Sequence, residues 1–333
     1  MSSSKIDFRT EVTVNNFPFR ISYQTPVLFC GSCFAENIGG IMQSYKMPVQ
    51  VNPFGVVYNP FSVAKALRNI LQNKQYTGND LNHRNGLWFS FDHYTRFSSE
   101  SQEECLLKIN DACSSAHEFI KKANLIAVTF GTARVYRLVT TGQVVANCHK
   151  IPAKEFTHTL LSVDEIVTEW SELIDEVLAV TPNIRFLFTV SPIRHWKDGA
   201  IGNQLSKSTL ILAVHRLVEI YSDKAFYFPG YEIMMDDLRD YRFYDTDMLH
   251  PSQLAVDYIW QKFSDALIER QAMQVTEKVH RIQQALSHRP VNPKSQEFKR
   301  FVDIILNEVS SIQKQYPFLN FNEEVNKLKS YIV

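Results

Sequence analysis

Three residues of this chain have the types and spacing that nucleophilic catalysis requires. They are a serine at a turn and a distant aspartate–histidine pair. Ser32 follows Gly31 and the apolar run 27–30, and a helical pattern begins just after it. Asp247 and His250 lie three residues apart, far downstream. A serine hydroxyl becomes a nucleophile when an imidazole removes its proton and a carboxylate orients that imidazole. Together the three residues predict a serine hydrolase.

The apolar run before Ser32 has the features of a buried parallel strand that leads into a helix. Ala35, Ile38 and Met42 recur at helical spacing after it. The serine would then lie at a helix N-terminus, where free backbone N–H groups and the helix dipole stabilise an oxyanion. The alternative is that Ser32 only caps the helix, a role in which serine is favoured.

The aspartate–histidine pair falls in a segment that we expect to be a loop. Pro251 restricts His250 to extended backbone, and Ser252 can cap a following helix. A histidine on such a loop can reach a substrate. The alternative is a surface aspartate and histidine that make no contact with each other.

Residues 31–35 read Gly-Ser-Cys-Phe-Ala, and with them the chain resembles a bacterial GSCFA domain protein. The resemblance runs from about residue 14 to 263 and includes segments 52–55, 129–133, 147–150 and 191–195. That family is similar to the SGNH, or GDSL-like, hydrolases, in which a serine follows the first strand and an Asp-x-x-His block near the C-terminus completes the triad. The resemblance implies that Ser32 is the nucleophile, His250 the general base and Asp247 its orienting group.

Two departures from the SGNH pattern concern residues next to the nucleophile and in the oxyanion hole. Gly31 stands where that family has aspartate, and the block that begins at Gly131 lacks the asparagine whose amide donates to the oxyanion. Loss of such a donor costs about 2.7–4 kcal/mol of transition-state stabilisation. Thr132 is the first candidate for its replacement. The alternatives, each of which can also be structural, are Asn59, Asn147 and His195.

Gly55 matches the SGNH block whose backbone N–H donates to the oxyanion. With the N–H of Ser32 it would complete the oxyanion hole. Its other interpretation is an ordinary turn glycine.

Arg194 lies in the segment Ser191–Trp196, after a predicted strand. A guanidinium there can bind a substrate carboxylate or phosphate in a bidentate manner. It can equally pair with an acidic residue and hold a loop in place.

Short apolar runs alternate with longer helical patterns in βαβ order, which predicts a three-layer α/β/α fold of SGNH-hydrolase type, also described as flavodoxin-like. Five parallel strands are expected at 26–30, 48–51, 125–130, 185–190 and 225–228, and helices at 64–71, 105–119, 163–180 and 207–221. Ligands bind such sheets beyond the carboxyl ends of the strands. Ser32, Gly131 and Ser191 each follow a predicted strand, so we expect them at that edge.

Two segments predict β-hairpin insertions. In the first, 79–96, Leu87, Phe89 and Phe91 would alternate inward. In the second, 135–146, Thr141-Gly142 forms the turn, and the hairpin would carry Asn147 toward the strand ends.

Composition limits the partners. The chain has 333 residues with 35 basic and 35 acidic side chains, so charge favours neither nucleic acid nor an anionic membrane.

Five cysteines in a long chain argue against a disulfide framework, and no carboxylate, cysteine or histidine cluster has metal-ligand order. Residues 1–7 lack a signal-peptide core, and no apolar run is long enough to span a bilayer. We therefore expect a cytoplasmic protein without metal or cofactor.

The chain divides into a hydrolase domain at 14–270 and a helical extension at 271–333. In the extension, residues 288–293 suggest a hinge before an amphipathic helix, which can dock on the main domain or mediate self-association. From the wider SGNH resemblance we expect the substrate to be an acyl ester of a small molecule or a carbohydrate. The alternatives are a binding module that has lost turnover, and an acyltransferase that uses the same triad.

Overall fold

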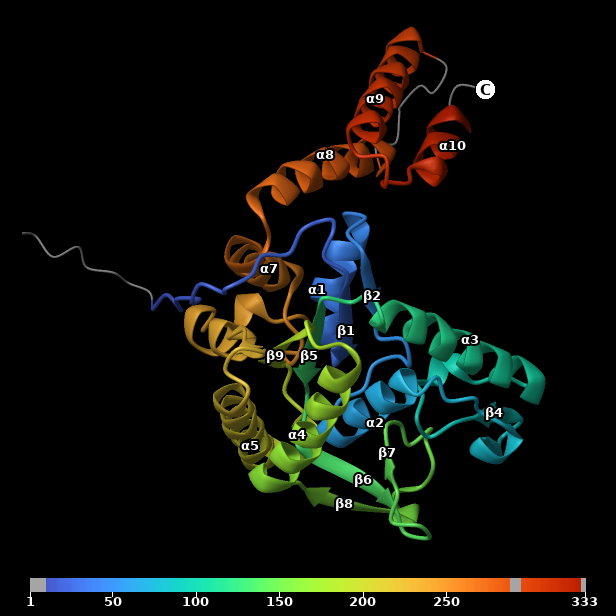
Figure 1. Ribbon diagram of the computed structural model, residues 1–333, viewed down its shortest axis with the longest axis vertical. Coiled ribbons are helices and arrows are strands. Elements are labelled where there is room, and N and C mark those ends of the chain that lie inside the picture. Colours follow the sequence, from blue (N-terminus) through green and yellow to red (C-terminus); the bar gives the residue numbers. More distant parts are fainter. Residues whose placement is uncertain (1–9, 288–294, 331–333) are drawn as a thin grey trace, which may run out of the picture.

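The computed structural model describes residues 10–287 and 295–330, and its centre is a parallel five-stranded sheet (Figure 1). The strand order is β10-β9-β5-β1-β2, and every neighbouring pair is parallel. The strands are β1 (Val27–Gly31), β2 (Val49–Val51), β5 (Leu125–Phe130), β9 (Arg185–Val190) and β10 (Ala225–Tyr227). The five predicted strands are confirmed, and their order is that of a flavodoxin-like sheet.

Helices cover both faces of the sheet. Successive strand residues point to opposite faces, so each strand contributes side chains to both helical layers. Leu28 and Cys30 pack among the helices of one layer, whereas Val27 and Phe29 pack in the other. The first layer holds α2 (Pro60–Leu71), α3 (Gln102–Ile120), α4 (Val163–Val180) and α5 (Gly199–Ile220). The second holds α1 (Cys33–Ser44) and α7 (Gln253–Leu267). The three-layer prediction is therefore confirmed.

The first insertion forms the antiparallel hairpin of β3 (Asn82–Arg84) and β4 (Leu87–Phe89). Phe89 and Phe91 are buried as predicted, but Leu87 is exposed, so its expected inward position is wrong. Leu87 pairs with Arg84 beside the turn, in the exposed segment 82–87 at the tip of the hairpin.

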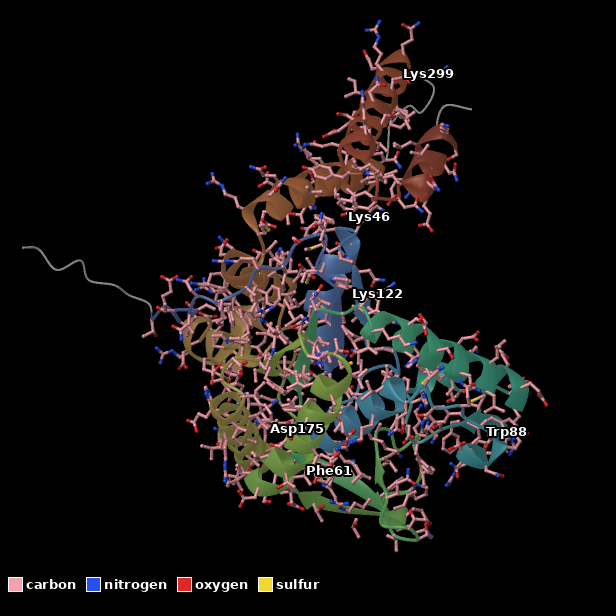
Figure 2. The ribbon with its side chains drawn as sticks, viewed as in Figure 1. Lys46, Phe61, Trp88, Lys122, Asp175 and Lys299 are labelled. Carbon is pink, nitrogen blue, oxygen red and sulfur yellow. The ribbon has the colours of Figure 1, made fainter. Side chains whose placement is uncertain are left out.

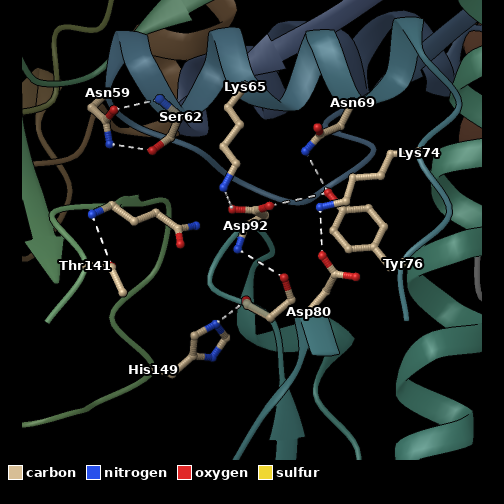
Figure 3. Close-up of polar contacts among 12 residues, drawn as sticks. Asn59, Ser62, Lys65, Asn69, Lys74, Tyr76, Asp80, Asp92, Thr141 and His149 are labelled. Carbon is tan, nitrogen blue, oxygen red and sulfur yellow. Dashed lines mark hydrogen bonds and ion pairs between the residues drawn. The ribbon is translucent and has the colours of Figure 1, made fainter. Parts of the chain in front are cut away.

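The second insertion is a three-stranded antiparallel sheet of β6 (Arg134–Leu138), β7 (Val144–Val145) and β8 (Phe156–Leu160). The hairpin was predicted, whereas β8 was not. Figure 3 shows polar contacts around the first insertion: Lys65 of α2 pairs with Asp92 at 2.6 Å, and His149 Nε2 lies 2.9 Å from the Ser90 carbonyl.

The remaining short helices connect these elements. They are α6 (Gly230–Glu232), the π-helical turn Ile233–Asp237, and 3₁₀ turns at Gly78–Asp80, Thr95–Phe97, Ala153–Glu155, Trp196–Asp198 and Tyr241–Phe243.

Three C-terminal helices lie beyond α7 and project from the main body (Figure 1). They are α8 (Arg270–Ser287), α9 (Gln296–Gln315) and α10 (Asn322–Ser330), and they enclose an apolar cluster of their own. Lys46, which follows α1, pairs with Glu324 of α10 at 2.7 Å and lies where this extension meets the main body (Figure 2). The predicted hinge at 288–293 and the expectation for residues 1–7 fall outside the described residues. Self-association stays a prediction.

No helix in the described ranges is both long enough and apolar enough to cross a membrane.

Candidate active site

Ser32 lies at the turn between β1 and α1, where the sequence places it. It occupies the N-cap position of α1, yet its side chain makes no capping hydrogen bond. The residue is 2% exposed, and its Oγ has no hydrogen-bond partner in the part of the chain that the structure describes. A buried hydroxyl without a partner is costly in a purely structural role. Capping therefore does not account for this serine.

Gly31, at the position where the SGNH pattern has aspartate, leaves no room for a side chain. Its φ is +135°, and a Cβ built on it would lie 2.1 Å from the Thr129 carbonyl oxygen of β5. Its N–H donates to Asn52 Oδ1 at 2.8 Å. No side chain fits there without breaking the pairing of β1 with β5, so glycine is required.

Asp247 and His250 are in contact. Asp247 Oδ2 lies 2.5 Å from His250 Nδ1, and Asp247 Oδ1 accepts the N–H groups of Leu249 and His250 at 2.9 Å each. The backbone N–H donors of His250 and Leu249, with the imidazole, lower the pKa of Asp247 to about 2. Both side chains are about half exposed. The alternative of a pair without contact is thereby excluded, and Nε2 of His250 is left for a substrate or a nucleophile.

A cavity of about 580 Å³ at the carboxyl edge of the sheet contains Ser32 and His250. Asp247 lines a neighbouring cavity of about 600 Å³. No hydrogen bond joins Ser32 to His250 in this structure. Five further predicted site residues line the first cavity: Asn59, Thr132, Asn147, Arg194 and His195. Gly55 and Gly131 do not line it.

The backbone donors expected in the oxyanion hole are engaged elsewhere. The Ser32 N–H donates to the Thr129 carbonyl at 3.1 Å, and the Gly55 N–H donates to the Asn52 carbonyl at 2.8 Å. Gly55 has a φ of +83°, and a Cβ there would meet Tyr94 Cβ at 2.2 Å. The structure thus corrects the prediction for these two groups, because Gly55 serves as a turn glycine against Tyr94.

Three of the four side-chain candidates for the missing donor already hold local structure. Asn59 caps α2 through Ser62, with Oδ1 accepting its N–H at 2.8 Å and Nδ2 donating to its hydroxyl at 3.0 Å. The Thr132 hydroxyl lies 3.0 Å from that of Ser206 and accepts the Arg134 N–H. The remaining candidate of the three, Asn147, donates to the Thr95 hydroxyl at 3.3 Å and accepts the His149 N–H at 2.9 Å.

His195 is the candidate whose ring nitrogens make no hydrogen bond to the described residues. Its Nε2 lies 3.2 Å from the place where a Gly131 Cβ would stand, and its ring meets Tyr58 edge-on at 5.5 Å. Burial, helped by the charges of Lys207 and His250, lowers the pKa of His195 to about 4. The imidazole is therefore neutral at neutral pH and can donate one N–H into the cavity.

Lys207 is a site-supporting residue that sequence reasoning missed. Its side chain is fully buried, and Nζ donates to the carbonyls of Gly131 at 2.5 Å and Ser191 at 2.6 Å. It thus ties together the ends of β5 and β9. Burial, with the nearby charge of Arg194, lowers the pKa of Lys207 to about 7. The available signal was a lysine on the same helical face as Leu210.

Among the described residues, no group of three or more histidine, cysteine, aspartate or glutamate side chains lies close enough together to hold a metal ion. All five cysteines are free thiols, and burial raises the pKa of the Cys30 thiol to about 12. Cys30 and Cys33 have the Cys-x-x-Cys spacing that is typical of redox motifs, but Cys30 lies in the buried strand β1.

These features define a three-layer α/β protein with a buried serine and an aspartate–histidine pair at the carboxyl edge of its sheet. More specifically, the chain belongs to the GSCFA family, whose model matches residues 26–263. A second model, described as the C-terminal domain of GSCFA domain proteins, matches residues 279–333. No curated protein matches the chain.

Two solved structures resemble the chain at low identity. One is described as a platelet activating factor from Streptococcus pneumonia, with 12% identity, a TM-score of 0.37, and coverage of 73% of this chain and 83% of the other. The other is a carbohydrate esterase family 3 protein from Talaromyces cellulolyticus, with 7% identity, a TM-score of 0.37, and coverage of 76% and 98%.

Proposed function

We propose that this protein is a serine esterase that cleaves acyl esters through a covalent acyl-enzyme. The observation that carries the proposal is the arrangement at the carboxyl edge of the sheet. Asp247 pairs with His250 at 2.5 Å, and His250 lines the same cavity as a buried Ser32 hydroxyl that has no partner among the described residues. This arrangement supports Ser32 as the nucleophile, His250 as the base and Asp247 as the orienting group of an acyl transfer.

In the first half of the reaction Ser32 Oγ attacks the ester carbonyl carbon and His250 Nε2 accepts the hydroxyl proton. Asp247 holds the imidazole through Nδ1 and stabilises its positive charge. Collapse of the tetrahedral intermediate breaks the bond to the alcohol oxygen, which takes the proton from His250. Water then attacks the acyl-serine by the same route and releases the acid. The Ser32 to His250 hydrogen bond forms when substrate closes the site, because such contacts are commonly long without substrate.

His195 is the group that we assign to the oxyanion. Its neutral ring lies against Gly131, at the position of the block whose asparagine is missing, and its nitrogens are unengaged among the described residues. A neutral imidazole stabilises a developing negative charge by N–H donation without itself exchanging a proton.

The test is steady-state hydrolysis of aryl acetates by the wild type and by Ser32→Ala, His250→Ala and His195→Ala. Ser44→Ala, at the exposed end of α1, is the matched control, because it removes a serine hydroxyl from the same helix. We expect kcat to fall at least about 10³-fold for Ser32→Ala and His250→Ala. For His195→Ala we expect a fall of about 10²- to 10³-fold, the effect of one oxyanion donor.

A non-catalytic binding module is the second candidate. The observation in its favour is that the Ser32 and Gly55 N–H groups are engaged by carbonyls. Folded wild type that turns over none of the esters would reject the esterase and favour the binding module. Turnover that survives in Ser32→Ala would reject the assigned nucleophile.

A further inference from the structure

The cavity that contains Ser32 and His250 carries an excess of positive charge. Four cationic side chains and one carboxylate line it: Arg134, Lys150, Arg194, Lys197 and Asp198. The carboxylate is already shared, since Asp198 lies 3.8 Å from both Arg134 Nε and His158 Nε2. The chain as a whole is neutral, with 35 charges of each sign. The excess is thus a local property of this site.

Arg194 is partly buried, unlike the exposed Lys150 and Lys197 of the same cavity. Its Nη2 contacts Met235 Sδ at 3.3 Å, and no carboxylate lies within ion-pair distance of it among residues 10–287 and 295–330. A thioether is a weak acceptor, so most of the five guanidinium donors stay available. The alternative in which Arg194 pairs with an acidic residue of its loop is not realised. The half-buried charge also acts on Lys207, whose pKa it helps to lower.

Arg194 lies where the two cavities of the site meet. It lines the cavity of about 580 Å³ that holds Ser32 and His250, and also the cavity of about 600 Å³ that holds Asp247. Trp196 lines both as well and is 55% exposed, so it offers an apolar surface beside the guanidinium. An ester bound at Ser32 can therefore extend past the imidazole to the arginine.

We propose that the substrate is an ester that carries an oxyanion, a carboxylate or a phosphate, and that Arg194 binds this group. The inference rests on the esterase proposed above and names its substrate class. The planar guanidinium fork matches either anion with two parallel hydrogen bonds, and the surrounding cations concentrate anions at the cavity. Half burial of the arginine strengthens the contact relative to an exposed ion pair.

The experiment compares two pairs of acetyl esters that differ in one charge-bearing group. The carboxylate pair is 4-acetoxybenzoate and methyl 4-acetoxybenzoate. The phosphate pair is 4-acetoxyphenyl phosphate and its dimethyl ester. The measured quantity is the ratio of kcat/KM for the anionic member to that for the neutral member, in wild type, Arg194→Gln and Arg194→Lys. Comparison of the two pairs decides which anion the site prefers.

Arg216→Gln is the matched control for charge. It removes one arginine from the exposed surface of α5, where Arg216 pairs with Asp164. Residue 216 lies roughly 25 Å along the helix axis from Gly199, at the end of α5 near the site. A loss of preference caused only by net charge would appear in this variant too.

We expect the wild-type ratio to be at least about tenfold for one pair, and to fall at least about fivefold in Arg194→Gln but not in Arg216→Gln. Arg194→Lys should keep part of the preference, because it retains the charge without the fork. A wild-type ratio of one or less for both pairs, or an unchanged ratio in Arg194→Gln, would overturn the anion proposal while leaving the esterase intact.

A binding measurement separates this proposal from the proposed function. Calorimetric titration of Ser32→Ala with both members of each pair reports affinity without turnover. If no ester is hydrolysed by the wild type, tighter binding of an anionic member that is lost in the double variant Ser32→Ala/Arg194→Gln supports the anion site and rejects the esterase. Equal binding of anionic and neutral members in both pairs overturns the anion site.

Discussion

Replacement of His93 by phenylalanine should remove part of the acid sensitivity of this protein. His93 is fully buried in the first insertion, and neither ring nitrogen has a hydrogen-bond partner in the part of the chain that the structure describes. Its ring centroid lies 4.3 Å from that of Phe54, 5.0 Å from Tyr76 and 5.2 Å from Phe97. A phenyl ring fits this aromatic surrounding without a group to titrate.

The size of the change in unfolding free energy follows from the pKa of His93. Burial, with the charges of Lys74, His149 and Lys65, lowers it to about 3 from the ordinary 6.5. Between these values the unfolded chain binds a proton that the folded chain does not, so the free energy of unfolding falls as the pH falls below 6.5. Each pH unit in this window costs about 1.4 kcal/mol. From pH 8 to pH 5 the contribution of His93 is thus a loss of about 2 kcal/mol.

The assay is urea unfolding of wild type and His93→Phe at pH 8 and pH 5. We expect the loss of unfolding free energy between the two pH values to be about 2 kcal/mol smaller in His93→Phe. Any packing cost of the larger ring applies equally at both pH values and cancels in this difference.

Phe97→Leu is the control, because it alters the same aromatic cluster without removing a titratable group. It should lose stability equally at both pH values. An identical pH difference in wild type and His93→Phe would refute the reasoning, since it would mean that His93 gains its proton as readily in the folded chain.

Three further predictions concern the site. Asp247→Asn should lower kcat for ester hydrolysis by as much as about 10⁴-fold, because an amide no longer fixes the histidine tautomer; steady-state kinetics check this, and unchanged kcat would remove Asp247 from the mechanism. Lys207 has a folded pKa of about 7 against 10.5 unfolded, so the unfolded state binds more protons between these values and stability rises with pH there. Denaturant unfolding from pH 7 to 9 should lose this rise in Lys207→Met, and an equal rise would contradict the argument. Gly31→Ala should destabilise the fold by at least about 1–3 kcal/mol through its positive φ alone, and a melting temperature equal to that of wild type would refute the required glycine.

The sequence was sufficient for the central fold because each strand is a short apolar run in βαβ order. Those runs bury both faces of the sheet, so periodicity and spacing report them directly. The strand β8 escaped prediction because only Phe156 of its five residues is buried, which leaves no alternating pattern to detect. The first turns of α5 were also missed, since Gly199 and Gly202 interrupt its start.

The position of the candidate triad was predictable from residue type and order, whereas its catalytic roles stay a prediction. Ser32, Asp247 and His250 lie at the sheet edge that the strand ends define. The hydrogen-bond partners of the Ser32 and Gly55 N–H groups were not predictable. They are backbone carbonyls on the adjacent strand β5 and in the local turn, and a backbone carbonyl carries no side-chain signature. Lys207 escaped for a related reason: its partners are the carbonyls of Gly131 and Ser191.

Covalent labelling of Ser32 tests the central claim most directly. The purified wild type is treated with a fluorophosphonate probe and the labelled peptide is identified by mass spectrometry, with Ser32→Ala, His250→Ala and Ser44→Ala treated alongside. The account predicts one adduct, on Ser32, present in wild type and Ser44→Ala and lost in Ser32→Ala and His250→Ala. A folded wild type that takes no label, or an adduct on another serine, would contradict it.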